Sequence, residues 1–121
     1  MNRPRTAALT NERRGDVLVI SIVGRLAASG GDVALRDVID HALATGDRKL
    51  VLDFEQLQTL DSSGLGELLS AASRVAAVGG WMAWAACPRT MLDLLEITHV
   101  DVGGVGFHAT VDEAAAAGQA S

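Results

Sequence analysis

Three oxygen-bearing side chains follow one another at the most distinctive point of the sequence, within the stretch Leu60–Gly66. Asp61, Ser62 and Ser63 directly precede an apolar helical pattern, so we expect them at the amino end of a helix, where several backbone N–H groups lack partners. A short oxygen side chain is a good cap for such an end. Capping needs only one of the three, so the run predicts a further role in addition to the cap.

The two glycines of this stretch, Gly64 and Gly66, add no side chains to the surface around the serines. A partner could therefore approach the backbone closely at this turn. We predict a partner-binding site there, and its candidate residues are Asp61, Ser62, Ser63, Gly64, Leu65 and Gly66.

Other chemistries lack their motifs. A serine hydrolase would need a Gly-x-Ser-x-Gly elbow and a histidine base, and none of His41, His99 and His108 is identifiably placed to activate Ser62. The glycine-rich turn leaves nucleotide binding open, although no Gly-x-x-x-x-Gly-Lys-Ser/Thr pattern is present. We therefore expect no catalytic residues, no metal and no cofactor.

The elements on either side position this turn. Residues 49–54 form a short apolar run typical of a buried strand, and apolar residues recur at helical spacing from Leu65 to Ala76. The site is thus predicted to follow the carboxyl end of the third strand, where open α/β sheets carry their function.

The rest of the chain predicts alternating elements around that unit. Strands are expected at 6–11, 17–23, 81–87 and 105–108, and further helices near 35–43, 88–98 and 111–118. These elements predict a single α/β domain that opens with a β-hairpin and has a mixed sheet of about five strands with about four helices. We expect a disordered tail at 1–5, the domain at 6–118 and a frayed end at 119–121.

Composition excludes several classes of partner. Fifteen acidic and ten basic residues give the 121-residue chain a formal net charge of -5, without the basic stripe that duplex nucleic acid requires. The longest low-polarity stretch, 75–87, is well short of the ~20 apolar residues of a membrane span. The single cysteine, Cys87, and the lack of a secretory h-region indicate a cytoplasmic protein.

These residues together resemble the STAS family, the anti-sigma factor antagonists of bacteria, over nearly the whole domain. The most specific part is the block Val51–Phe54 followed at the expected distance by Asp61–Gly66. A weaker part is Leu94–Thr98, which is similar to the family's segment at the end of the third helix.

The resemblance implies a switch protein rather than an enzyme. In such antagonists the serine after the aspartate, here Ser62, is phosphorylated by a partner anti-sigma factor that is also an ATP-dependent serine kinase. The unphosphorylated form binds that kinase and releases a sigma factor, and a serine phosphatase resets the switch. Ser63 would then be the neighbouring cap.

One segment departs from the family pattern. Many antagonists have Gly-Glu-Leu-Asp after the second strand, whereas this chain has Gly24-Arg25-Leu26-Ala27 and loses both acidic positions. We therefore add Arg25 to the predicted partner-binding residues and expect an atypical partner or a different branch of the family. Arg25 either pairs with a phosphate or an acidic partner, or is an ordinary exposed arginine.

A second interpretation keeps the fold without the switch. STAS-like domains also serve as scaffold or regulatory subunits of stress-sensing assemblies and lipid-transport complexes. In that case Ser62 is a helix cap that is never modified.

Overall fold

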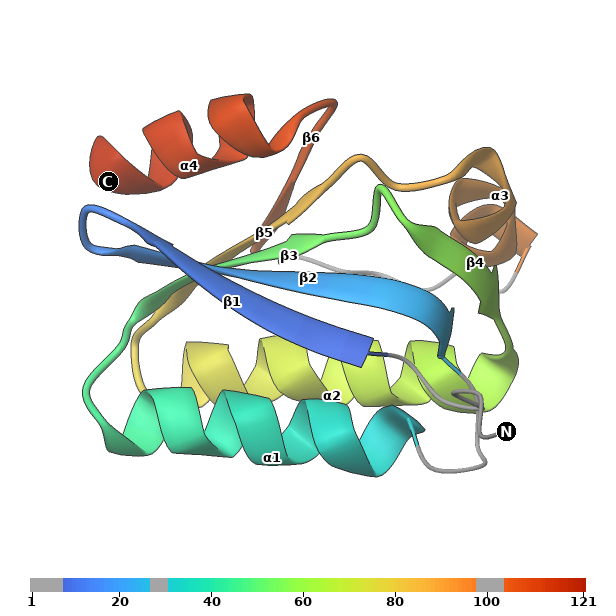
Figure 1. The fold of residues 1–121 in the computed structure, drawn as a ribbon, viewed down its shortest axis with the longest axis horizontal. Coiled ribbons are helices and arrows are strands. Elements are labelled where there is room, and N and C mark those ends of the chain that lie inside the picture. Colours follow the sequence, from blue (N-terminus) through green and yellow to red (C-terminus); the bar gives the residue numbers. More distant parts are fainter. Residues whose placement is uncertain (1–7, 27–30, 98–103) are drawn as a thin grey trace, which may run out of the picture.

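The computed structural model describes residues 8–26, 31–97 and 104–121 and confirms an α/β domain with an opening hairpin (Figure 1). The elements in chain order are β1 (Ala8–Arg14), β2 (Val17–Leu26), α1 (Gly31–Ala44), β3 (Lys49–Asp53), β4 (Leu57–Leu60), α2 (Ser62–Ala77), β5 (Trp81–Ala85), α3 (Arg89–Ile97), β6 (Val105–His108) and α4 (Val111–Gln119). The predicted tail at 1–5 and the region around His99 lie outside the described residues.

The strands form one mixed sheet in the order β1-β2-β3-β5-β6, and β4 pairs separately with β2. The β1–β2 hairpin is antiparallel, and every other pair is parallel. In a parallel sheet of this kind the carboxyl ends of the strands meet at one edge. That edge carries the starts of α2, α3 and α4 (Figure 1).

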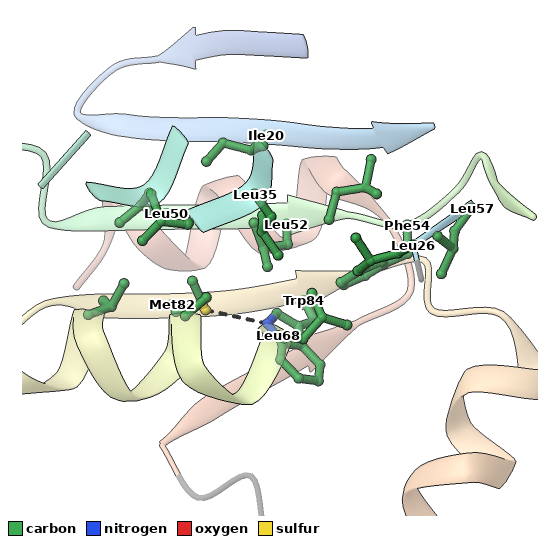
Figure 2. Packing of buried hydrophobic residues seen from close by; sticks show 14 of the residues in the cluster. Ile20, Leu26, Leu35, Leu50, Leu52, Phe54, Leu57, Leu68, Met82 and Trp84 are labelled. Carbon is green, nitrogen blue, oxygen red and sulfur yellow. Dashed lines mark hydrogen bonds between the residues drawn. The ribbon is translucent and has the colours of Figure 1, made fainter. Parts of the chain in front are cut away.

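The two faces of the sheet differ in side-chain size. Helices α1 and α2 lie side by side on one face, over large apolar residues that include Ile20, Leu50, Leu52 and Trp84 (Figures 1 and 2). The indole Nε1 of Trp84 donates to the Met82 sulfur at 3.4 Å, so its polar atom is satisfied within this core. Helix α4 covers the other face.

Small residues line that second face and let α4 approach closely. They are Val17, Val19, Val51, Ala83 and Ala85, and Ala114 of α4 packs with them. The chain end is tied to the hairpin by Gln119 Nε2, which donates to the Arg14 carbonyl at 3.0 Å, and to β3 by Lys49 Nζ, which donates to the Ser121 carbonyl at 2.8 Å. The frayed end expected at 119–121 is thus held by hydrogen bonds in this structure.

One strand that the sequence did not predict, β4, lies between β3 and Asp61. After β3, Leu57 N donates to the Phe54 carbonyl at 3.1 Å in a tight turn, and the four residues of β4 then pair with the end of β2. β2 correspondingly continues to Leu26, beyond the end expected at Val23. The Leu-Gln-Thr-Leu sequence of β4 does not alternate apolar and polar residues, so the sequence did not reveal this strand.

Candidate functional site

Asp61 caps helix α2. Its backbone is extended, with φ -106° and ψ -179°, and its Oδ1 accepts a hydrogen bond from Gly64 N at 2.8 Å. Its own carbonyl accepts the first helical bond, from Leu65 N at 2.9 Å. The capping role that was predicted for one of the three polar residues therefore belongs to Asp61. The expectation that Ser63 is the neighbouring cap was wrong.

Ser62 and Ser63 are the first two residues of α2, and both are exposed. Within the described parts of the chain neither hydroxyl makes a hydrogen bond, and neither backbone N–H finds an acceptor. The first turn of α2 also contains no acidic residue. Two hydroxyls and two N–H groups are therefore available to an incoming group at the positive end of a helix dipole.

The two glycines of the motif have different roles. Gly64 is buried, and a Cβ built on it would lie 2.3 Å from the Leu26 carbonyl oxygen. Gly66 is exposed, and a Cβ there would meet nothing within 4 Å. Only Gly66 leaves the surface bare as predicted, whereas Gly64 allows α2 to touch the end of β2.

Leu65 also belongs to the interior, since its side chain is only 3% exposed. It starts the apolar stripe of α2, which continues through Leu68, Ala71 and Val75. The buried residues Leu65 and Gly64 thus anchor the start of α2 against the core. Of the predicted partner-binding residues, the exposed ones are Asp61, Ser62, Ser63, Gly66 and Arg25.

The two serines lie on different sides of α2. Glu67 is four residues after Ser63 and therefore on the same side of the helix, where its Oε2 accepts from Arg36 of α1 at 3.0 Å. Ser62 is turned by one residue, about 100°, and has Gly66 four residues after it. Ser62 thus sits above the bare glycine, away from the contact between α1 and α2.

Arg25 lies at the end of β2 opposite Thr59 of β4, next to a register shift between Gly24 and Arg25. Its neighbour Leu26 pairs with Leu60, and the Leu26 carbonyl accepts from Asp61 N at 3.4 Å. The backbone of Arg25 therefore lies near the start of α2, but its exposed side chain alternates with the buried Leu26 and projects from the opposite face of the sheet.

Cys87 is not a reactive thiol. It is half-buried against the large apolar cluster, and burial raises the pKa of its thiol to about 12. A thiol with so high a pKa carries almost no thiolate near neutral pH. Cys87 therefore acts as a small hydrophobe at the edge of the core.

A second polar region escaped sequence reasoning. A cavity of about 310 Å³ lies where β2, β3 and the start of α4 meet, and its lining includes Ser21, Asp53, Glu55 and Asp112. Ser21 Oγ donates to Asp53 Oδ2 at 3.1 Å from the neighbouring strand. The signal that points to this region is Ser21 itself, the polar residue that interrupts the run Val17–Val23.

Other candidate chemistries gain no support from the geometry. Among residues 8–26, 31–97 and 104–121 no three His, Cys, Asp or Glu side chains are grouped so that they could bind a metal ion. No helix in the same residues is long and apolar enough to cross a membrane. His41 lies in the last turn of α1, at the far end of that helix from the start of α2 (Figure 1).

Comparison with known proteins places the sequence in a family. The profile of the STAS domain matches residues 8–114, nearly the whole chain. No curated protein matches the sequence.

Several solved structures share the fold. TM1081 of Thermotoga maritima, described as a candidate anti-sigma factor antagonist, is 21% identical with a TM-score of 0.82, and the match covers 92% of this chain and 94% of that one. An anti-sigma factor antagonist of Mycobacterium paratuberculosis is 22% identical with a TM-score of 0.80, covering 98% and 99% of the two chains. The phosphorylated form of SpoIIAA, a Bacillus cell fate determinant, is 26% identical with a TM-score of 0.71, covering 91% and 98%.

Proposed function

The chain belongs to the STAS family, and from that premise we propose that it is an anti-sigma factor antagonist switched by phosphorylation of Ser62. Its unphosphorylated form binds an anti-sigma factor that is also a serine kinase and thereby frees a sigma factor; a serine phosphatase reverses the modification. The observation that carries the proposal is Ser62 itself, an exposed hydroxyl without a hydrogen bond at the start of α2, beside a residue that already supplies the cap. SpoIIAA, 26% identical, is known in a phosphorylated form, which supports the same chemistry here.

The fold tolerates a phosphate at this position. Because Asp61 makes the capping bond, a modified Ser62 loses no interaction on which the helix depends. The phosphate adds about -1.5 to -2 charges. At the amino end of α2 the helix dipole stabilises such a charge by roughly 0.3–1 kcal/mol.

Binding is affected in the opposite direction. A partner that packs against the bare surface at Gly66 has to desolvate whatever Ser62 carries. A buried hydroxyl that finds no hydrogen bond costs about 1–3 kcal/mol, whereas a dianion that finds no partner costs far more. The same modification thus leaves folding nearly unchanged and weakens association, which is what a switch requires.

Site-resolved phosphopeptide mass spectrometry on the protein from its host, during growth and under stress, tests the proposal directly. We expect phosphate on Ser62, with an occupancy that changes between conditions, and none on the neighbouring Ser63. A Ser62 that remains unmodified in every condition, in a protein that co-purifies in a stable complex, would favour the scaffold role instead.

Variants of the two serines test the effect on binding to the co-purified kinase. Ser62→Ala should bind like the unmodified protein and accept no phosphate, whereas Ser62→Asp should lose about 2 kcal/mol or more, roughly 30-fold in Kd. Ser63→Ala removes the neighbouring hydroxyl but keeps Ser62, so it should still accept phosphate. Equal affinity of Ser62→Ala and Ser62→Asp for the kinase would contradict the switch.

A further inference from the structure

The two edge strands of the sheet, β1 and β6, differ in charge. β1 carries Glu12, Arg13 and Arg14, and both arginines are held in ion pairs. Charged side chains of this kind protect a sheet edge from pairing with further strands. β6 has the sequence Val-Gly-Phe-His, without Lys, Arg, Asp, Glu or Pro. The edge at β6 therefore lacks the protection that the edge at β1 has.

Phe107 of β6 is the uncovered end of a row of large apolar side chains that crosses the sheet. Its Cα is paired with that of Trp84, and the row continues through Leu52 to Ile20. These three inner residues have no solvent exposure and lie in the core beneath α1 and α2 (Figure 2). Phe107 is 45% exposed, although its ring meets that of Trp84 edge to face with the centroids 5.4 Å apart. The apolar layer of the sheet thus extends beyond its cover at β6.

The backbone of β6 offers hydrogen-bonding groups on the same side. The His108 carbonyl accepts from Ala86 N at 2.9 Å, so His108 bonds toward β5. Backbone groups alternate between the two edges of a strand, so Gly106 also faces β5, whereas Val105 and Phe107 direct their N–H and C=O groups to the free edge. Within the described residues these outward groups have no partner.

We propose that β6 pairs antiparallel with β6 of a second copy of the chain, about a two-fold axis at Gly106. In this register Val105 of each copy lies opposite Phe107 of the other, and each such pair exchanges two backbone hydrogen bonds. The two side chains lie on the same face of the joined sheet, so Phe107 gains an apolar neighbour. Gly106 lies opposite its own counterpart. Self-pairing in this register joins no two charged residues.

The small size and the neutrality of β6 determine how the association should behave. A strand of four residues with one exposed ring buries less area than a standard interface, so we expect a dissociation constant in the micromolar range or weaker. Each copy has a formal net charge of -5, and the copies therefore repel each other over a distance. Salt screens that repulsion, so raised salt should strengthen the dimer. The pairing does not depend on the state of Ser62.

Sedimentation velocity of the full chain, from about 10 μM to about 1 mM, tests the proposal. We expect a monomer–dimer equilibrium that Phe107→Lys, which places a charge on β6, weakens at least about tenfold. Phe107→Thr removes the ring but keeps a residue that favours strands, and should weaken the dimer in the same direction. Val78→Lys is the matched control, because Val78 is 46% exposed but lies at the end of α2, and it should associate like the parent. Thermal unfolding verifies that each variant is folded.

Cysteine cross-linking tests the register. In a Cys87→Ala background, Gly106→Cys should form a disulfide-linked dimer, since opposite residues of a non-hydrogen-bonded antiparallel pair lie within disulfide reach. A Cβ at Gly106 would meet the His108 ring at 3.3 Å, and this side chain can move aside. Ala76→Cys, at an exposed position of α2, should not cross-link. A parent that is monomeric at about 1 mM, an equal loss of association in Val78→Lys and Phe107→Lys, or a dimer that Gly106→Cys fails to link would overturn the proposal.

Discussion

Helices α2 and α4 both begin at the carboxyl edge of the sheet, and each begins with a side-chain cap on its third residue. Asp61 Oδ1 accepts from Gly64 N at 2.8 Å, and Thr110 Oγ1 accepts from Glu113 N at 3.1 Å. The first turn of α4 then supplies its own negative charge through Asp112 and Glu113, and Asp112 also pairs with Arg14. The first turn of α2 has no acidic residue and no such pair.

This difference separates a helix start that is complete from one that is open. The first turn of α4 carries two acids, so an added anion would meet more like charge there than at α2, where the one acid is the capping Asp61. At α2 the cap holds the helix, while two hydroxyls and the positive dipole end remain exposed beside Gly66. The capability of the site therefore comes from what the first turn of α2 leaves unpaired, since both helices share the cap.

The largest expected change in stability at the start of α2 comes from its two glycines, of which Gly64 is buried and Gly66 is exposed. Gly64→Ala places a Cβ against the Leu26 carbonyl, so the helix start has to move, and we expect a loss of about 3 kcal/mol in the free energy of unfolding. Gly66→Ala meets no atoms and replaces a poor helix former, so a gain of up to about 1 kcal/mol is expected.

Urea denaturation of both glycine variants measures these changes, and affinity for the partner kinase completes the comparison. Gly66→Ala should weaken binding although it folds well, because its methyl group projects from the proposed contact surface. If Gly66→Ala bound normally and Gly64→Ala were as stable as the parent, the division of roles between the two glycines would be wrong.

The caps themselves should have intermediate effects of similar size in the two helices. Asp61→Ala and Thr110→Ala each remove the acceptor of one helix-end N–H, and each should cost about 1 kcal/mol of stability. Asp61→Asn keeps an acceptor and should cost only a few tenths of that. Thermal unfolding measures the stability of all three variants.

The cap variants also separate two roles of Asp61. If it is only a cap, Asp61→Asn should be phosphorylated by the partner kinase at the parental rate. A large loss of rate in a stable Asp61→Asn protein would show that the carboxylate also orients the Ser62 hydroxyl.

Sequence reasoning could predict most of this fold because local signals and tertiary structure agree. The β-branched run of β2, the helical spacing of α2 and the Thr110–Glu113 cap each specify their element locally. The alternating order of strands and helices then determines a parallel sheet and the edge of the sheet that carries the site.

The parts that could not be predicted depend on contacts between distant segments. The pairing of β4 with β2 brings residues 24–26 beside 57–60, and no local pattern encodes it. The same contact explains why Gly64 is buried while Gly66 is bare, although both are glycines within one motif. Which of Asp61, Ser62 and Ser63 is the cap likewise depends on backbone geometry that three similar side chains do not reveal.

The smallest expected change in stability comes from variants that exchange an acidic residue between the starts of α2 and α4. Ser63→Asp gives α2 the acid at its second position that Asp112 provides in α4, and the dipole should stabilise it by about 0.5 kcal/mol. Asp112→Ser makes the reverse change, removes the pair with Arg14, and should destabilise the protein. A carboxylate favoured in the folded state has a lowered pKa there, so the gain in Ser63→Asp is present above its unfolded pKa and is lost as the pH falls through the folded one. Urea denaturation of both variants near pH 7 and near pH 3, at low salt, measures the exchange. No gain at pH 7 for Ser63→Asp would mean that the start of α2 is not the open anion-accepting end on which the proposed switch depends.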